Sequence, residues 1–392
     1  MQILMLGIPG TALKRPVDWA LQYGHIVWYV GEYDFYEKEP PRNYRFIPSV
    51  LKKVKQEQNL VTDLNETEKE NLRPLQITQL HQIVAEFQPN IIHAHGFCYE
   101  LECCVQANIH PLVLSIWGFL ILEPKKFNNY DEFYPKLYSV MKAADAVIVE
   151  SPVLREQCQA LLQPAQKIAL IPLGTDTQHF RPYTGENIDK AKQLLRFPQQ
   201  VKVLLSPRGW DRLYCQHEIL EAFTIVKSQL AHPTILVFIL LGRSSIKEHK
   251  SYYEYFRKRV EDLELSKQIY FLPPFSYEMM PFVYSLSDAI INFPTVDAFP
   301  STLIEASACA KPIITAQLPS YQSTFVEEFC TLVPPHDIAS LSTAIVKIVN
   351  QPEVERREHL ALLRQTIIEQ YDERIMQQRL FTLYDQLASV NN

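Results

Sequence analysis

Short apolar runs alternate with longer amphipathic stretches along most of the chain. The first apolar run covers residues 2–6, an amphipathic stretch over 12–23 ends at Gly24, and a second apolar run covers 25–30. Apolar runs of this length predict buried strands, and apolar residues at helical spacing predict helices. Because a helix separates the two strands, we expect them to pair in parallel.

The same alternation recurs in two blocks, which predicts two α/β domains, each built on a parallel sheet. Further strands are predicted at 90–94, 146–149, 201–205, 234–241, 268–272 and 289–291, and further helices at 75–87, 138–145, 218–230, 251–263, 277–285 and from 354 onward. A polar stretch over 183–200 is expected to link the blocks. Residues 32–74 give no clear pattern and are broken by Pro40-Pro41.

Composition narrows the class of protein. A chain of 392 residues with 47% hydrophobic content suits two globular domains. The net charge of −6 argues against a nucleic-acid-binding protein, and we expect no such partner. Seven cysteines without a CxxC pair indicate reduced thiols in a cytoplasmic protein. No run is long enough for a membrane span or for the apolar core of a signal peptide.

A basic amphipathic stretch at residues 49–60 contains Lys52, Lys53 and Lys55. One interpretation is a patch that contacts an anionic membrane surface or an acceptor, which would place the protein peripherally at the inner face of a membrane. The other interpretation is a solvated helix face. The sequence leaves both interpretations open.

The most informative stretch is residues 292–315, NFPTVDAFPSTLIEASACAKPIIT. An apolar strand leads into a turn, and Ser301 is expected to be the N-cap of the helix that follows. A helix N-terminus offers unpaired N–H groups and a positive dipole end to an anion. Asp297 in the turn and Glu305 in the helix could accept hydrogen bonds from sugar hydroxyls. Together these features predict a site for a nucleotide-sugar.

This stretch resembles the Glu-x7-Glu signature of family 4 glycosyltransferases, with Asp297 in place of the first Glu and Glu305 as the second. Pro300 and Ala310 stand where the family usually has Gly. Further matches are residues 143–182, which contain IPLGTDTQHFRP, and Arg208 in SPRGWDR. The resemblance implies a GT-B fold, in which two Rossmann-like domains face each other across a cleft. It implies domains at 1–182 and 183–370, with a C-terminal helix at 371–392 that packs back on the first domain.

The resemblance also implies roles for individual residues. The family clamps the donor diphosphate with an Arg, matched by Arg208, and a Lys, whose position holds Leu213; Arg212 is a candidate substitute. Asp297 would hold the donor sugar and Glu305 the ribose. His95 of the HAHGF segment would face the cleft between the domains; the alternative is that His93 and His95 form a structural pair near the end of a strand. The remaining implied contacts to the donor are Gly10, Phe299, Ser301 and Thr302.

One departure from the family concerns Trp117, which occupies a position that is often His. Trp has only an N–H donor and cannot act as a general base, but it could stack on a sugar ring.

The resulting hypothesis is a retaining transferase that moves a sugar from a UDP- or GDP-sugar to a hydroxyl of a glycan, lipid or small molecule. The sequence has no Asp-x-Asp pair and no cluster with metal-ligand spacing, so we expect no metal and no other cofactor. Two alternatives remain. The chain could be a degenerate GT-B protein that binds nucleotide or sugar without transfer, or an epimerase or phosphorylase on the same fold.

Overall fold

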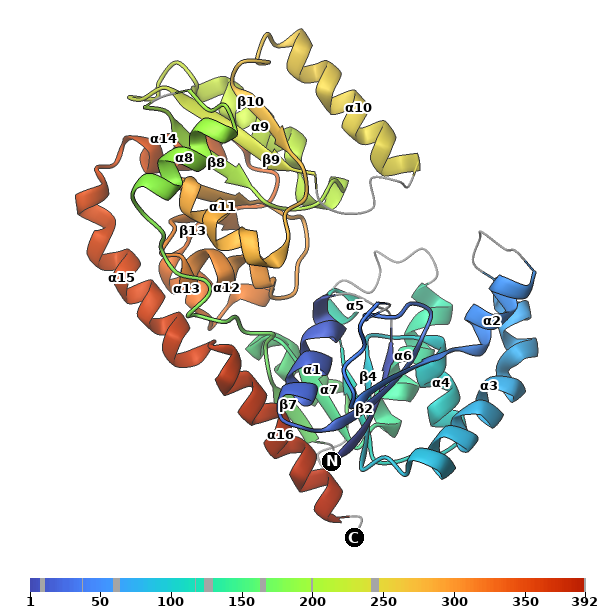
Figure 1. The fold of residues 1–392 in the computed structure, drawn as a ribbon. Coiled ribbons are helices and arrows are strands. Elements are labelled where there is room, and N and C mark those ends of the chain that lie inside the picture. The colour runs from blue at the N-terminus through green and yellow to red at the C-terminus, as the bar shows by residue number, and fades with distance from the viewer. Residues whose placement is uncertain are drawn as a thin grey trace. The chain divides into compact units, whose positions relative to one another are not determined.

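The chain folds into two units in the computed structural model (Figure 1). The structure describes residues 1–7, 11–36, 38–58, 64–116, 118–122, 130–162, 167–198, 200–240 and 247–390. Unit 1 consists of Met1–Leu173 and Met376–Asn392, and unit 2 consists of Gly174–Ile375. The chain therefore divides earlier than Pro182, where the sequence suggests the boundary.

Unit 1 contains a seven-stranded parallel sheet in the order β3-β2-β1-β4-β5-β6-β7. Its strands are β1 (Gln2–Gly7), β2 (Ile26–Gly31), β3 (Tyr44–Pro48), β4 (Ile91–His95), β5 (Leu112–Ser115), β6 (Ala146–Val149) and β7 (Lys167–Leu170). Its helices are α1 (Thr11–Gln22), α2 (Val50–Glu57), α3 (Glu66–Phe87), α4 (Tyr99–Gln106), α5 (Phe119–Leu122), α6 (Tyr130–Ala143), α7 (Pro152–Leu161) and most of α16 (Glu373–Val390). Helices flank the sheet on both faces (Figure 1).

Unit 2 contains a six-stranded parallel sheet in the order β10-β9-β8-β11-β12-β13. Its strands are β8 (Lys202–Ser206), β9 (Thr234–Ile239), β10 (Ile269–Leu272), β11 (Ala289–Asn292), β12 (Ile313–Ala316) and β13 (Thr331–Val333). Its α-helices are α8 (Glu186–Leu194), α9 (Gln216–Val226), α10 (Lys247–Asp262), α11 (Met280–Leu286), α12 (Ser301–Ala308), α13 (Phe325–Phe329), α14 (Ile338–Asn350) and α15 (Glu353–Gln370). Short 3₁₀ helices are η2 (Arg212–Tyr214), η3 (Tyr277–Met279) and η4 (Pro319–Tyr321).

The structure confirms two α/β units with parallel sheets and corrects several local predictions. The stretch expected to be a linker, 183–200, contains α8. The helix expected from residue 75 begins at Glu66, where Asn65 and Glu68 form a reciprocal capping box, and it continues through Pro74. The hydrophobic pattern did not predict α8 or the first part of α3. The first is a polar helix and the second contains a proline, so neither has a clear apolar stripe.

The last helix, α16, belongs to unit 1 from Met376 onward. Its buried residues include Leu380 and Tyr384, and the Tyr384 hydroxyl lies 2.5 Å from Nδ1 of His93 on β4. The C-terminal helix therefore packs on the first domain, as the sequence predicts. The contact joins residues that are 291 positions apart in the chain.

Tyr384→Ala should destabilise unit 1 by about 3–5 kcal/mol, because it empties a fully buried aromatic site and removes the partner of His93. Urea unfolding followed by far-UV circular dichroism measures the loss. Thr382→Ala, on the exposed face of the same helix, is the matched control and should stay within about 0.5 kcal/mol of wild type. Equal stability of both variants would show that α16 does not help to hold unit 1 together.

Candidate active site

The strand order of unit 2 reverses between β8 and β11, which are hydrogen-bonded neighbours. Open α/β sheets bind ligands outside the carboxyl ends of their strands at such a switch point. Arg208 lies in the loop after β8, and Asp297 lies in the loop after β11. The fold alone therefore brings together two residues that are far apart in the sequence.

Arg208 and Asp297 form a buried ion pair, with 3.2 Å between Nη2 and Oδ2. The guanidinium also lies over the ring of Tyr214, 4.3 Å from its centroid. Burial acts to lower the pKa of Arg208, but the negative charge of Asp297 and the interactions with Tyr214 and Tyr321 together outweigh it, and the pKa is raised. Arg208 therefore stays charged, as a phosphate-binding group must.

Asp297 keeps unused hydrogen-bonding capacity. Its Oδ1 accepts from the backbone N–H of Ala298, whereas its buried Oδ2 has the ion pair with Arg208 but, among the described residues, no hydrogen bond of good geometry. Its own backbone carbonyl accepts from Oγ of Ser320. Burial raises the pKa of Asp297, and the charge of Arg208 opposes that rise. A ligand hydroxyl could supply the missing donor.

Helix α12 begins directly after this turn, and one prediction about it is wrong. Its N-cap is Pro300, in an extended conformation, and Ser301 is the first residue of the helix. No N-cap side chain bonds to the first turn, because proline has no polar side-chain group. Ser301 and Thr302 are half-buried, and the side chain of Phe299 lies in the core, so only backbone of Phe299 is offered to a ligand.

Glu305 is buried within α12 rather than exposed on the helix surface. Its Oε2 accepts a hydrogen bond of 3.0 Å from the hydroxyl of Tyr284 on α11. Burial raises the pKa of Tyr284 and the neighbouring charge of Glu305 raises it further, so the hydroxyl remains a donor. The carboxylate is therefore oriented by a tyrosine that the sequence did not indicate.

Arg212 does not join Arg208 in this structure. Its side chain is exposed, and its guanidinium lies 5.0 Å from the centroid of the Tyr252 ring. The residue of η2 that reaches Arg208 is Tyr214. In the sequence, Tyr214 lies one residue after Leu213, which occupies the position of the family's Lys. Sequence reasoning passed over Tyr214 because it looked for a second cation, and an aromatic ring is not one.

The sheet of unit 1 has its own switch point between β1 and β4. A Cβ on Gly7, at the end of β1, would lie 2.6 Å from the carbonyl oxygen of His95, so this close approach requires glycine. The rings of His93 and His95 lie side by side, with centroids 3.9 Å apart, as expected for alternate residues of one strand. Gly10 and Trp117 lie outside the described residues.

His95 is buried, and its Nε2 has no hydrogen-bond partner within the described ranges. Burial lowers the pKa of His95 to about 3, so the imidazole is neutral at physiological pH. Its neighbour His93 is committed to Tyr384 and to Oγ of Ser115. His95 therefore retains an unused polar atom at the switch point, whereas His93 is structural.

Unit 1 also contains a cavity of about 350 Å³ between helices α2, α3, α4 and α6. Phe97 and Phe133 meet edge to face in its lining, with centroids 4.9 Å apart. The other charged and aromatic residues of the lining are Glu32, Lys55, Glu66, Lys69, Arg73, Tyr99, Glu100, Glu102, Glu132 and Lys136. A cavity with an aromatic wall and many side-chain donors and acceptors can bind a polyhydroxyl compound.

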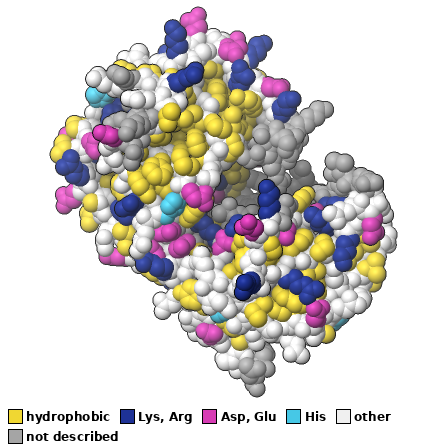
Figure 2. All heavy atoms as spheres, viewed as in Figure 1, with side chains coloured by type: hydrophobic (Ala, Val, Ile, Leu, Met, Phe, Trp, Pro, Cys, Tyr) yellow, Lys and Arg dark blue, Asp and Glu magenta, His cyan; other side chains and the backbone are white. Residues whose placement is uncertain are grey.

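The basic stretch of α2 offers little free positive charge. Lys55 pairs with Glu32 at 2.8 Å, and the ammonium of Lys52 lies 4.7 Å from the centroid of the Tyr33 ring, which leaves Lys53 exposed. Figure 2 shows basic and acidic side chains interspersed over the visible face rather than separated by sign. Among the described residues, no helix is long and apolar enough to cross a membrane. Peripheral membrane contact stays a prediction.

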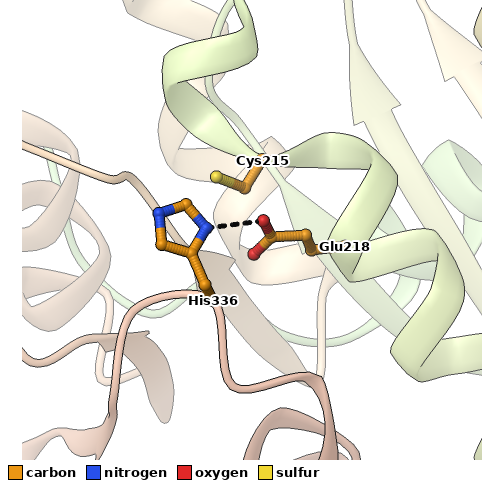
Figure 3. Close-up of side chains that lie close together, drawn as sticks. All are labelled: Cys215, Glu218 and His336. Atoms are coloured by element: carbon orange, nitrogen blue, oxygen red, sulfur yellow. Dashed lines mark hydrogen bonds and ion pairs between the residues drawn. The ribbon is translucent and has the colours of Figure 1, made fainter.

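A third group of polar side chains lies outside both switch points. Cys215, Glu218 and His336 of unit 2 bring their ligand-type atoms within 4.8 Å of one another (Figure 3). The sequence gives no sign of this group, because His336 lies 118 positions after Glu218 and only the fold places it there.

Two doubly wound units in one chain are typical of the GT-B class, and solved structures of that class share this fold. Sucrose-phosphate synthase from Thermosynechococcus elongatus superposes with a TM-score of 0.80 at 18% identity, over 100% of both chains. The Anabaena HepE protein in complex with UDP-glucose gives 0.75 at 18% identity, over 99% of this chain and 100% of that one. An E. coli trehalose-6-phosphate protein bound to UDP-2-fluoro glucose gives 0.73 at 12% identity, over 98% and 99%.

Family models match along most of the sequence. Residues 58–179 match "Glycosyltransferase Family 4", and residues 187–361 match "Glycosyl transferases group 1". The chain therefore belongs to the group 1, family 4 glycosyltransferases. Two proteins named D-inositol 3-phosphate glycosyltransferase are each 24% identical, from Corynebacterium urealyticum over 41% of this chain and from Saccharomonospora viridis over 55%. These matches span 38% and 50% of the relatives' own length.

The buried histidine gives a pH-dependent prediction. The pKa of His95 is about 3 in the folded protein, against about 6.5 when unfolded, so the unfolded state binds more protons between these values. Above the pKa of His95 in the unfolded protein, His95 does not lower the free energy of unfolding. Below that pKa, it lowers the free energy of unfolding more as the pH falls. His95→Asn should reduce the slope of unfolding free energy between pH 4.5 and 6 by about 1.4 kcal/mol per pH unit.

Urea unfolding at several pH values measures this slope. His81→Asn is the control, because His81 lies exposed on α3 of the same unit, and this variant should keep the wild-type slope. An unchanged slope in His95→Asn would mean that His95 is accessible to protons in the folded protein.

Proposed function

We propose that this chain transfers a sugar from a nucleotide-diphosphate sugar to a hydroxyl acceptor. The observation that carries the proposal is the buried Arg208–Asp297 pair at the switch point of unit 2, directly before a helix whose first turn has no side-chain cap. A cation and free backbone N–H groups suit a diphosphate, while a carboxylate suits sugar hydroxyls. Membership of the group 1, family 4 glycosyltransferases supports the same reaction.

In this proposal Arg208 stabilises the negative charge that develops on the leaving diphosphate. Such electrostatic stabilisation is commonly the largest single contribution to catalysis, because the charged group is already in place. The N-terminus of α12, at Ser301 and Thr302, adds backbone donors on the same side. The ring of Tyr214 lies against the guanidinium of Arg208 and helps to hold it in position. Arg212 supplies no charge here unless the loop rearranges on binding.

The two carboxylates, Asp297 and Glu305, would bind different parts of the donor. When phosphate oxygens replace Asp297 as the partner of Arg208, Asp297 becomes free to accept from the donor sugar through Oδ2, which in the ligand-free protein pairs with Arg208. Glu305, oriented by Tyr284, binds the ribose hydroxyls. His95 is neutral and offers Nε2 to a hydroxyl of the reacting sugar.

We infer that the nucleotide is UDP, because structural neighbours were solved with UDP, UDP-glucose and UDP-2-fluoro glucose. For a further neighbour, trehalose-6-phosphate synthase, enzymatic glycosyl transfer is described as proceeding with retention. We propose retention for this chain on the same basis. GDP is the alternative nucleotide that a binding comparison must include.

The cavity of unit 1 is the proposed acceptor site. Its basic residues are already paired with carboxylates: Lys55 with Glu32, Lys69 with Glu66, and Arg73 with Glu102. Because these positive charges already have carboxylate partners, none is left unpaired to bind a phosphate. Its aromatic wall instead suits the apolar face of a sugar ring. We therefore propose a neutral polyhydroxyl acceptor.

The second candidate function is nucleotide-sugar binding without transfer. The specific observation in its favour is that Tyr214, rather than a second cation, lies beside Arg208. Sugar transfer from a UDP-sugar to a panel of neutral and phosphorylated acceptors decides between the two functions. Binding of the donor with no product from any acceptor would favour the binding protein.

Glu305→Gln and Asp297→Asn should distinguish binding of the nucleotide part of the donor from binding of its sugar. Glutamine keeps an acceptor for Tyr284 but removes the charge, so Glu305→Gln should weaken both UDP and the UDP-sugar by about tenfold to a hundredfold. Asp297→Asn should not weaken UDP binding, because phosphate is the partner of Arg208 in the proposed complex, and it should lower the rate of transfer, because Asp297 then contacts the sugar. Calorimetry measures the affinities, and a coupled assay of UDP release measures the rate.

Glu328→Gln is the matched control, since Glu328 is exposed on α13 of the same unit. It should bind UDP as wild type does. Unchanged UDP affinity in a folded Glu305→Gln variant would remove Glu305 from the donor site and undo the assignment of the motif.

Transfer should proceed at the same rate when Mg²⁺ and Mn²⁺ are withheld. The reason is that, in this proposal, Arg208 and the backbone N–H groups at the start of α12 neutralise the diphosphate in place of a divalent ion. Initial rates with and without each ion test this directly. A strict requirement for either ion would contradict the role given to Arg208.

A further inference from the structure

Three segments of unit 2 converge on the group formed by Cys215, Glu218 and His336. Cys215 lies at the junction of η2 and α9, Glu218 lies in the first turn of α9, and His336 lies between β13 and α14. Their sulfur, oxygen and nitrogen atoms all lie within 4.8 Å of one another. Figure 3 shows the three side chains pointing toward one another.

The carboxylate of Glu218 is only half satisfied. Its Oε1 lies 2.8 Å from Nδ1 of His336, but its Oε2 is buried and has no hydrogen-bond partner in the part of the chain that the structure describes. Glu218 itself is only 7% exposed. A buried, unpartnered carboxylate oxygen is costly, and a bound cation is one of the ordinary ways to satisfy it.

A simple Glu218–His336 ion pair does not explain the whole group. It accounts for Oε1, but it leaves Oε2 without a partner and gives no role to the buried thiol of Cys215. The thiol lies 3.7 and 3.9 Å from two backbone carbonyl oxygens of η2, and it also interacts with the carboxylate of Glu218. A ligand that binds sulfur, oxygen and nitrogen together satisfies all three groups.

We propose that Cys215, Glu218 and His336 bind one zinc ion. Thiolate, carboxylate and imidazole are the usual ligands of Zn²⁺, at about 2.0–2.3 Å from the metal, so two ligands of one ion are at most about 4.4 Å apart. The exposed side chain of His336 can close the remaining gap by rotation, and it also leaves a path for the ion.

Charge and protons balance at this site. Zinc binding releases one proton from the Cys215 thiol, and the resulting thiolate and the Glu218 carboxylate together neutralise the two positive charges of the ion. His336 binds as neutral imidazole. Because binding releases this proton, zinc affinity should rise with pH.

His217 provides a further donor beside the three ligands. Its Nδ1 lies 3.2 Å from the hydroxyl of Tyr252, which leaves Nε2 facing Oε1 of Glu218 at 3.7 Å. A partner on one ring nitrogen that orients the other is the common arrangement around metal-binding histidines. His217 therefore lies beside the site, although it is not one of the three residues whose ligand atoms all lie within 4.8 Å of one another.

The ion would stabilise a loop rather than take part in transfer. Cys215 directly follows Tyr214, whose ring supports Arg208. A metal that joins Cys215 to the loop before α14 would fix the end of η2 and, through Tyr214, the position of Arg208. This role is independent of Mg²⁺ or Mn²⁺ at the diphosphate and does not rest on the proposed function.

The test is titration of the metal-free full chain with Co²⁺ and with Zn²⁺. Wild type should bind one equivalent of Co²⁺ and develop a thiolate-to-cobalt charge-transfer band together with the visible bands of a tetrahedral site. Cys215→Ser should lose the charge-transfer band. His336→Ala should weaken Zn²⁺ binding by about tenfold or more, and Zn²⁺ should raise the melting temperature of wild type more than that of this variant.

His232→Ala is the matched control, because His232 is exposed on the same unit and outside the group. It should bind both metals as wild type does. His336 is mostly exposed, so its variant should fold even if Cys215→Ser does not. The proposal is overturned if wild type binds no stoichiometric Zn²⁺, or if His336→Ala binds it as tightly as wild type.

Discussion

A buried guanidinium needs a countercharge, and the loop after β11 supplies it to the loop after β8 through Asp297. Removing either partner would leave the other charge buried and unpaired. The pair therefore fixes the turn before α12 and, through Tyr214, the end of η2. A phosphate can replace the carboxylate as the partner of Arg208 without leaving the cation unpaired. The ligand-free protein thus keeps Arg208, the cation proposed to bind phosphate, paired with a countercharge.

Much of the fold could be predicted because it depends on local patterns. Apolar runs gave most of the strands, and strand–helix alternation is sufficient to predict parallel sheets. The resemblance to family 4 implied that Arg208 and Asp297 both serve the donor, but their meeting at one switch point depends on the strand order, which only the structure shows. The helix that returns to the first domain followed from the same resemblance, and its buried face is visible in the spacing of Leu380 and Tyr384.

The remaining features depend on contacts that no local pattern encodes. Ser301 has the chemistry of an N-cap, but the extended backbone of Pro300 makes it the first helical residue. Tyr214 reaches Arg208 because η2 turns the chain there, whereas Arg212, with the better charge, points away. His336 contacts Glu218 only because the fold packs the loop before α14 against the start of α9. In each case tertiary packing decides among side chains that look equally suitable in the sequence.

The division of the chain between the units has a consequence for synthesis on the ribosome. Unit 2 is one continuous segment, Gly174–Ile375, whereas unit 1 needs Met376–Asn392 as well as its long first segment. Domains usually fold in the order in which they emerge. Here the unit that emerges first is the one completed last, since His93 stays without Tyr384 until the final helix has been made. Nascent unit 1 must therefore persist with an uncovered apolar face while all of unit 2 is translated.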